Sequence, residues 1–175
     1  AADGNGNKLY VFAVQPGLTY SDGTPITARD YVFSVLLQSA PQTVAAGGMT
    51  TAYTALSGYA AYNAGTNAVF TGVRLIDDMT FSLNISGAYL PYYYELTYVS
   101  VKPYPIDVIA PGCVVADDGA GAYITSAFDA QGNPQGVFSA EVLTETLRNA
   151  DTGYCHHPAV TSGPYTMESY DPESG

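Results

Sequence analysis

Hydrophobic and polar positions alternate loosely near the beginning of the chain, over residues 8–14 (KLYVFAV), which predicts a β-strand. The segment YSDGTP at 20–25 predicts a turn, because Asp-Gly accepts a positive φ and the proline fixes the exit. Thr27 and Asp30 then have the spacing of a capping box, in which two side chains satisfy free amides at a helix start. We therefore expect a strand, a turn and a helix in that order.

Apolar residues at helical spacing predict that this helix covers residues 28–39 and ends before Pro41. A second helix is expected over about 50–63, because glycines bound the segment and apolar residues recur along one stripe of it. Ser139 can cap a third helix, over 140–149. These segments account for the longest helical patterns in the chain.

The clearest β pattern lies in residues 73–85 (VRLIDDMTFSLNI), where two alternating runs flank Asp77–Asp78 and predict a hairpin. No internal repeat is found. The mixture of helices, a hairpin and short strands indicates the α+β class, with a small mixed sheet and packed helices. The shorter expected elements are a helix near 90–98, a helical turn within 103–112, and strands at 98–102, at 123–128 and from 165 onward.

The chain has 16 acidic and 5 basic residues among 175, a formal net charge of −11. Nucleic-acid binding depends on Lys and Arg side chains that neutralise phosphates, and no basic stripe occurs, so nucleic acid is not an expected partner. No apolar run approaches the roughly eighteen residues that a membrane span needs. The Tyr-rich and Gly-rich composition suits a secreted or cell-surface protein. The abrupt ends lead us to expect a piece of a longer chain.

Cys113 and Cys155 are the only cysteines, and each lies beside Gly or His in a loop-like segment. Their separation excludes a CxxC redox motif. For an extracellular protein we favour a disulfide between them, which would contribute about 4 kcal/mol by constraining the unfolded chain. The alternative is a pair of unrelated buried thiols, which would suit a reducing compartment.

Candidate catalytic or metal-binding groups are sparse. The doublets Asp77–Asp78 and Asp117–Asp118 are interpreted as turn residues, because adjacent residues of a strand point to opposite faces. The segment ADDGAGAYI at 116–124 predicts a glycine turn, since it lacks the alternating acids and closing Glu of a calcium loop. The pair His156–His157 fits no zinc motif, although Cys155 beside it leaves a metal site as the lesser alternative.

No nucleotide-binding, α/β-hydrolase or metalloprotease motif occurs, so we expect neither an enzyme nor a bound cofactor or metal. A cluster of tyrosines is the remaining feature. It forms either a packing layer whose hydroxyls reach solvent, which we favour, or an aromatic face for a peptide or sugar. The residues alone thus indicate a non-catalytic extracellular binding domain. The clustered tyrosines are Tyr89, Tyr92, Tyr93, Tyr94, Tyr98 and Tyr104.

Three segments, in order, resemble the solute-binding proteins of peptide-type ABC importers, the oligopeptide- and dipeptide-binding protein family. Residues 9–37 (LYVFAVQPGLTYSDGTPITARDYVFSVLL) resemble that family's strand, its W-S-D-G-T-P turn and its T-A-x-D helix start, with Tyr20 in place of the usual Trp. Residues 71–109 resemble its D-D-x-T hairpin and the proline- and tyrosine-containing segments that follow. Residues 159–172 (AVTSGPYTMESYDP) resemble its G-T-G-P-Y strand. Three ordered blocks make the resemblance specific.

The resemblance implies an architecture of two lobes that close on a solute. It implies that residues 1–158 form the extra subdomain of the first lobe of a type II periplasmic binding protein, with an insertion at about 113–157. Residues 159–175 are then expected to begin a strand of the main lobe. The ligand-binding residues that it implies are Tyr53, Ser162, Gly163 and Tyr165, the last three near the lobe interface.

The function that the resemblance implies is capture of peptides or other small solutes and their delivery to an ABC import permease in the membrane. The expected location is extracellular, as a cell-surface lipoprotein or a periplasmic protein. A peptide-sensing or chaperone-like domain of the same fold is the first alternative, and an acidic secreted hydrolase domain is the least favoured one. We expect this chain to be a monomer, without enzyme activity.

Overall fold

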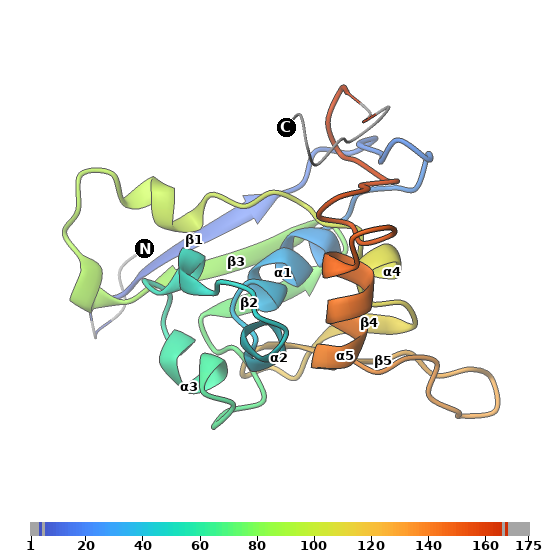
Figure 1. Ribbon diagram of the computed structural model, residues 1–175. Helices are drawn as coiled ribbons and strands as arrows, with labels where there is room; N and C mark the ends of the chain where they lie inside the picture. Colours follow the sequence, from blue (N-terminus) through green and yellow to red (C-terminus); the bar gives the residue numbers. More distant parts are fainter. Residues whose placement is uncertain (1–3, 5, 166, 168–175) are drawn as a thin grey trace.

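The computed structural model of the protein describes residues 4, 6–165 and 167. Its centre is a three-stranded antiparallel sheet with the order β1-β3-β2, formed by β1 (Lys8–Ala13), β2 (Val73–Asp77) and β3 (Thr80–Ile85). Helix α1 (Ala28–Leu37) packs against this sheet (Figure 1). Antiparallel strands with helices packed beside them confirm the predicted α+β class.

A second, two-stranded antiparallel sheet consists of β4 (Cys113–Asp117) and β5 (Ala122–Ser126). Backbone and side-chain contacts join it to the larger sheet. Phe70, shortly before β2, forms an isolated bridge with Ala122, and Asp117 at the end of β4 accepts hydrogen bonds from Arg74 of β2. The β4–β5 hairpin is therefore held near β2 by the Phe70–Ala122 bridge, by the Arg74–Asp117 ion pair, and by a hydrogen bond from the Leu75 N–H to Asp117.

The other helices are short, and none in the described part of the chain is long and apolar enough to cross a membrane. They are α2 (Pro41–Ala45), α3 (Tyr59–Asn63), α4 (Ile106–Ile109), α5 (Ala140–Leu143), the 3-10 turns η1 (Thr51–Tyr53), η2 (Gly87–Tyr89) and η3 (Glu95–Val99), and the π-helical turn η4 (Thr144–Arg148).

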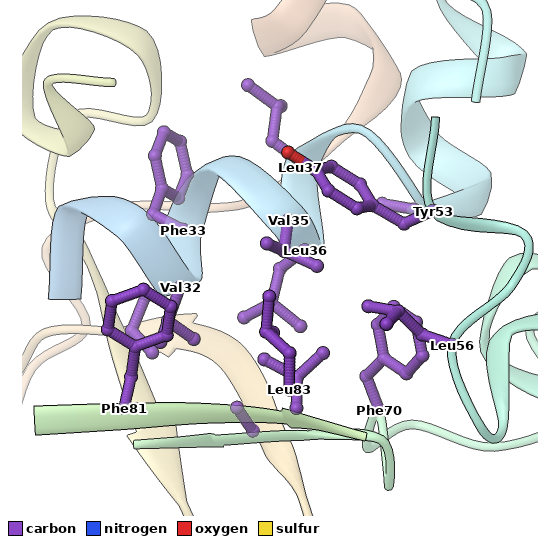
Figure 2. Close-up of a cluster of buried hydrophobic side chains, with 14 of the residues drawn as sticks. Val32, Phe33, Val35, Leu36, Leu37, Tyr53, Leu56, Phe70, Phe81 and Leu83 are labelled. Carbon is purple, nitrogen blue, oxygen red and sulfur yellow. The ribbon is translucent and has the colours of Figure 1, made fainter. Parts of the chain in front are cut away.

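The hydrophobic core surrounds α1 on nearly all sides. Val32 and Leu36 face Phe81 and Leu83 of β3, whereas Phe33 points away from the sheet (Figure 2). All five side chains are at most 3% exposed. A helix that is apolar all round is one that is buried all round, and each such side chain contributes about 2 kcal/mol through burial. α1 is therefore the central element of the domain.

The predicted start of α1 is confirmed. The Asp30 carboxylate accepts hydrogen bonds from the Thr27 backbone N–H at 2.8 Å and from the Thr27 hydroxyl at 3.0 Å. The prediction that Pro41 only ends this helix is incomplete, because Pro41 also begins α2. Proline is well suited to the first turn of a helix, where its missing N–H would have no partner.

The prediction of a single helix over residues 50–63 is wrong. Only η1 and α3 are helical there, and Gly58 precedes α3 with a φ of 80°. A Cβ at this position would lie 2.2 Å from Oγ1 of Thr71. The chain thus turns at Gly58 in a left-handed conformation and in close contact with a neighbouring segment, which a continuous helix would not allow.

The remaining predictions were partly correct. The hairpin at 73–85 is confirmed as β2 and β3, and the strand at 123–128 is confirmed as β5. Its partner β4 was not predicted. The helix at 140–149 appears as α5 followed by η4, whereas residues 90–98 contain a turn and η3, and residues 98–102 form no strand. The strand expected from 165 falls mostly outside the described residues.

Candidate functional site

The YSDGTP segment forms a tight turn held by local hydrogen bonds. The Gly23 N–H donates to the Tyr20 carbonyl at 3.0 Å, and the Tyr20 N–H donates to the Thr24 carbonyl at 2.8 Å. Oδ1 of Asp22 accepts from the Thr24 N–H at 2.9 Å. This is the arrangement in which aspartate stabilises a turn through its own following backbone, so Asp22 acts as a structural residue.

Ser21 connects this turn to residues 160–165. Its N–H donates to the Thr161 carbonyl at 2.8 Å, and the Thr161 N–H donates to Ser21 Oγ at 3.1 Å. The Tyr154 hydroxyl donates to the Val160 carbonyl at 2.7 Å. Figure 1 shows the two segments side by side, although one is near the beginning of the chain and the other near its end. The first and third resembling blocks therefore meet at one junction.

Tyr20 and Asp30 are buried below this junction, with 3% and 7% of their surface exposed. Burial raises the pKa of Tyr20 far above its usual value, and the neighbouring Asp30 charge adds to the increase. Burial also raises the pKa of Asp30, although hydrogen bonds from Thr27 oppose that increase. The Tyr20 hydroxyl makes no well-aligned hydrogen bond to a described residue. Tyr20 therefore packs beneath the turn as a buried side chain.

Tyr53, the tyrosine expected to contact a ligand, lies in the core. Its side chain is 4% exposed, its hydroxyl donates to the Ser100 carbonyl at 3.3 Å, and burial raises its pKa to about 12. In Figure 2 the hydroxyl points toward Leu37 of α1. This packing argues against direct contact between Tyr53 and a solute.

The other predicted ligand-binding residues are exposed beside the junction. Ser162, Gly163 and Tyr165 follow Thr161, and the Tyr165 side chain is 85% exposed. The Thr161 hydroxyl donates to the Tyr165 carbonyl at 3.2 Å, which closes this short segment into a loop. These residues thus form an accessible surface next to the YSDGTP turn, and their part in ligand binding stays a prediction.

A second accessible surface was only partly anticipated. We use the name tyrosine tip for Tyr89, Tyr92, Tyr93, Tyr94 and Leu96, which are all exposed. The Tyr93 and Tyr94 rings meet edge to face at 4.8 Å. Glu95, in the middle of the tip, accepts hydrogen bonds from Lys8 and from the Tyr10 hydroxyl of β1, and these bonds lower the pKa of its carboxyl group.

The favoured interpretation of this cluster, a packing layer, therefore needs correction. Tyr98 and Tyr104 do pack against the core, but the tip itself presents its rings to solvent. The sequence signal was present in the consecutive positions Tyr92, Tyr93 and Tyr94, which cannot all face inward.

The predicted disulfide is not formed. Cys113 is buried in β4 and 1% exposed, whereas Cys155 is exposed after η4, and both are free thiols. The two side chains line different hollows, Cys113 near Thr27 and Cys155 near Leu147. Within residues 4, 6–165 and 167, no group of three or more His, Cys, Asp or Glu side chains lies close enough to hold a metal ion.

The sequence is similar to three periplasmic binding proteins. It is 33% identical over 100 residues to the periplasmic oligopeptide-binding protein OppA of Salmonella typhimurium, an alignment that covers 56% of this chain and 18% of that protein. It is 30% identical over 105 residues to OppA of Escherichia coli, an alignment that covers 59% of this chain and 19% of that protein. It is 31% identical over 107 residues to the probable deoxycholate-binding periplasmic protein YgiS of Escherichia coli, an alignment that covers 61% of this chain and 20% of that protein. The chain thus spans about a fifth of the length of these relatives.

Among solved structures, an oligopeptide-binding protein of Borrelia burgdorferi aligns with a TM-score of 0.49 and 18% identity, over 74% of this chain and 33% of that one. OppA of Listeria monocytogenes, bound to peptide, aligns with a TM-score of 0.40 and 16% identity, over 73% of this chain and 32% of that one. The sequence profile of the bacterial extracellular solute-binding proteins, family 5 (middle region), matches residues 4–175. Since this match extends over nearly the whole chain, the protein belongs to the family 5 bacterial extracellular solute-binding proteins.

Proposed function

We propose that this chain is part of an extracellular solute-binding protein that captures peptides and delivers them to an ABC import permease. The observation that carries the proposal is the family match over residues 4–175. Two relatives named for oligopeptide binding support peptides as the solute class. Delivery to a permease and an extracellular location, at the cell surface or in the periplasm, follow from the same relationship.

The proposed place of the chain in the whole protein is the first lobe. Residues 1–158 would form its extra subdomain, and residues 159–175 would begin a strand of the main lobe. The junction between Ser21 and Thr161 supports this division, because it fastens the start of the second segment to a turn of the first. A binding protein of this kind gains affinity when two lobes close around a solute, so each lobe contributes only a part of the pocket.

We propose binding without catalysis. The described residues offer hydrogen-bonding surface at the Ser162–Tyr165 loop and aromatic surface at the tyrosine tip, and neither contains an arrangement of nucleophile and base. A binding protein needs an accessible, preorganised surface and no reactive group, which is what these two surfaces supply.

A second candidate solute deserves a test because of the relative YgiS, which is named as probably binding deoxycholate and is as similar to this chain as the OppA proteins are. The experiment is calorimetric titration of the whole protein with peptides of two to five residues and, separately, with deoxycholate. Saturable binding of one peptide per protein supports the proposal. Binding of deoxycholate alone supports the second candidate, and hydrolysis of the peptides would exclude a purely binding function.

A further inference from the structure

A cavity of about 630 Å³ lies between the end of α1, the segment after α2, and the chain from α5 to residue 156. Ligand pockets in proteins usually measure about 300–1,000 Å³, so this cavity can hold a small molecule. Its floor is firmly packed, since Leu37, Ile109 and Leu143 are at most 3% exposed. Six of the lining residues give its mainly apolar character: Leu37, Tyr104, Ile109, Leu143, Leu147 and Tyr154.

The charged side chain in this cavity is a cation, Arg148, in a chain with a net charge of −11. Three of the five basic residues are neutralised by carboxylates, in the pairs Lys8–Glu95, Arg29–Asp78 and Arg74–Asp117. Within the described part of the chain, Arg148 makes no such ion pair. Within the described residues, an acidic protein thus keeps one of its few cations without a carboxylate partner, at the wall of this cavity.

The Arg148 side chain is exposed, and one hydrogen bond holds its guanidinium at the wall of the cavity. Its Nη1 donates to the carbonyl of Ala46 at the end of α2. A Cβ on Gly47 would lie 2.1 Å from the same nitrogen, so the absence of a side chain there makes room for the guanidinium. A guanidinium has five N–H donors, and this carbonyl uses one of them. The other donors remain available for a planar anion such as a carboxylate.

We propose that this cavity binds an apolar group that carries a carboxylate, with the carboxylate on Arg148 and the apolar part against Leu143 and Leu147. Charge complementarity selects an anion, and the apolar walls select a hydrophobic body. The shared chemistry can come from a small amphipathic carboxylate or from the carboxyl end of a peptide with an apolar last residue. This site is distinct from the Ser162–Tyr165 loop and does not require the proposed peptide function.

Decanoate is the probe, and Cys155 reports its binding. Cys155 is exposed and lines the cavity, whereas Cys113 is buried elsewhere. Decanoate should bind saturably and slow the alkylation of Cys155, as followed by mass spectrometry of the corresponding peptide. Decanol, which has the same chain and no charge, should bind at least about tenfold more weakly, because a hydrogen bond to a charged group is lost. A bulky maleimide on Cys155 should abolish decanoate binding.

The decisive comparison is between Arg148→Gln and Lys102→Gln in the whole protein. Lys102 is exposed and is not among the residues that line this cavity, so its substitution removes the same charge without touching the site. Arg148→Gln should weaken decanoate binding at least about tenfold, and Lys102→Gln should leave it unchanged. Equal effects of the two substitutions, equal binding of decanol, or no protection of Cys155 would overturn the proposal.

Two further experiments distinguish a small carboxylate from a peptide as the ligand, and distinguish the proposed cavity site from the proposed peptide function. A leucine-terminated tripeptide is tested as its free acid and as its amide; protection of Cys155 by the acid alone identifies a peptide carboxylate as the source. Peptide capture by the whole protein is then measured in Arg148→Gln. If Arg148→Gln still captures peptides but no longer binds decanoate, the cavity is a site separate from the peptide site. If the unmodified protein binds decanoate but captures no peptide, only the proposed function is refuted.

Discussion

Replacing Asp117 by alanine should destabilise the contact between the two sheets. The Asp117 side chain is 8% exposed and accepts four hydrogen bonds. Two come from the Arg74 guanidinium, at 2.8 and 2.9 Å, one from the Leu75 N–H at 3.0 Å and one from the Gly119 N–H at 2.8 Å. One carboxylate thus joins β2 to the end of β4 and also shapes the β4–β5 turn.

The expected loss follows from the burial of the two partners. Removing one member of a buried ion pair costs about 3–5 kcal/mol, because the other charge is left without compensation. Arg74 is 38% exposed, however, so water can solvate its guanidinium after the substitution. We therefore expect the free energy of unfolding to fall by about 3 kcal/mol in Asp117→Ala, at the lower end of that range. Asp117→Asn should cost less, since its carbonyl oxygen can still accept from one backbone N–H.

The matched control is Asp78→Ala. Asp78 pairs with Arg29 at 3.0 Å, but these two side chains are 70% and 47% exposed, and surface pairs contribute at most about 1 kcal/mol. Urea-induced unfolding gives the two free energies, and hydrogen exchange at the β4–β5 amides shows where protection is lost. Similar losses in the two variants, or unchanged exchange in the hairpin of Asp117→Ala, would refute the reasoning.

The same ion pair should respond to acid. Burial alone would raise the pKa of Asp117, but hydrogen bonds from Arg74, Gly119 and Leu75 together lower it below the usual value. Since the pKa is lower in the folded state than in the unfolded state, the carboxylate stabilises the fold at neutral pH. This contribution is lost as the pH falls from about 5 through the folded-state pKa. The stability difference between the wild type and Asp117→Ala should therefore shrink in acid.

Two other predictions concern the glycine turn before α3 and the thiols. Gly58→Ala should lower the free energy of unfolding by at least about 2 kcal/mol, because the new Cβ would clash with Thr71 and the backbone has a positive φ. Gly23 also has a positive φ, but no atom lies near the position of its Cβ, so Gly23→Ala should lower the free energy of unfolding by only about 1 kcal/mol. A thiol reagent without reductant should titrate Cys155 in the native protein and both cysteines after denaturation, since Cys113 is buried. Equal losses in the two glycine variants, or the absence of any reactive thiol in denaturant, would contradict these expectations.

The parts of the fold that were predictable are those whose signals are local. The capping box of Thr27 and Asp30 and the hairpin at 73–85 each depend on side chains within a few positions of one another, and both are confirmed. The elements that were missed depend on distant partners. β4 is a strand because β5 pairs with it, and Gly58 interrupts a helical pattern because Thr71 approaches it.

The candidate site was harder to predict for the same reason. A pattern could place Tyr53 on an apolar stripe, but its burial depends on packing against α1, which no local signal contains. The two cysteines were paired on the basis of an expected compartment, and the geometry then separated them into different hollows. Likewise, the cavity beside Arg148 is formed by segments about a hundred positions apart, so no local sequence motif predicts it.

The central claim, capture of a peptide without cleavage, is tested most directly by mass spectrometry of the whole protein. The protein is incubated with a mixture of short peptides, separated from the free peptides and examined first in native solution and then after denaturation. The account predicts one peptide per protein in the native spectrum and release of that peptide at its original mass. A protein that retains no peptide, or that releases only cleaved fragments, would contradict it.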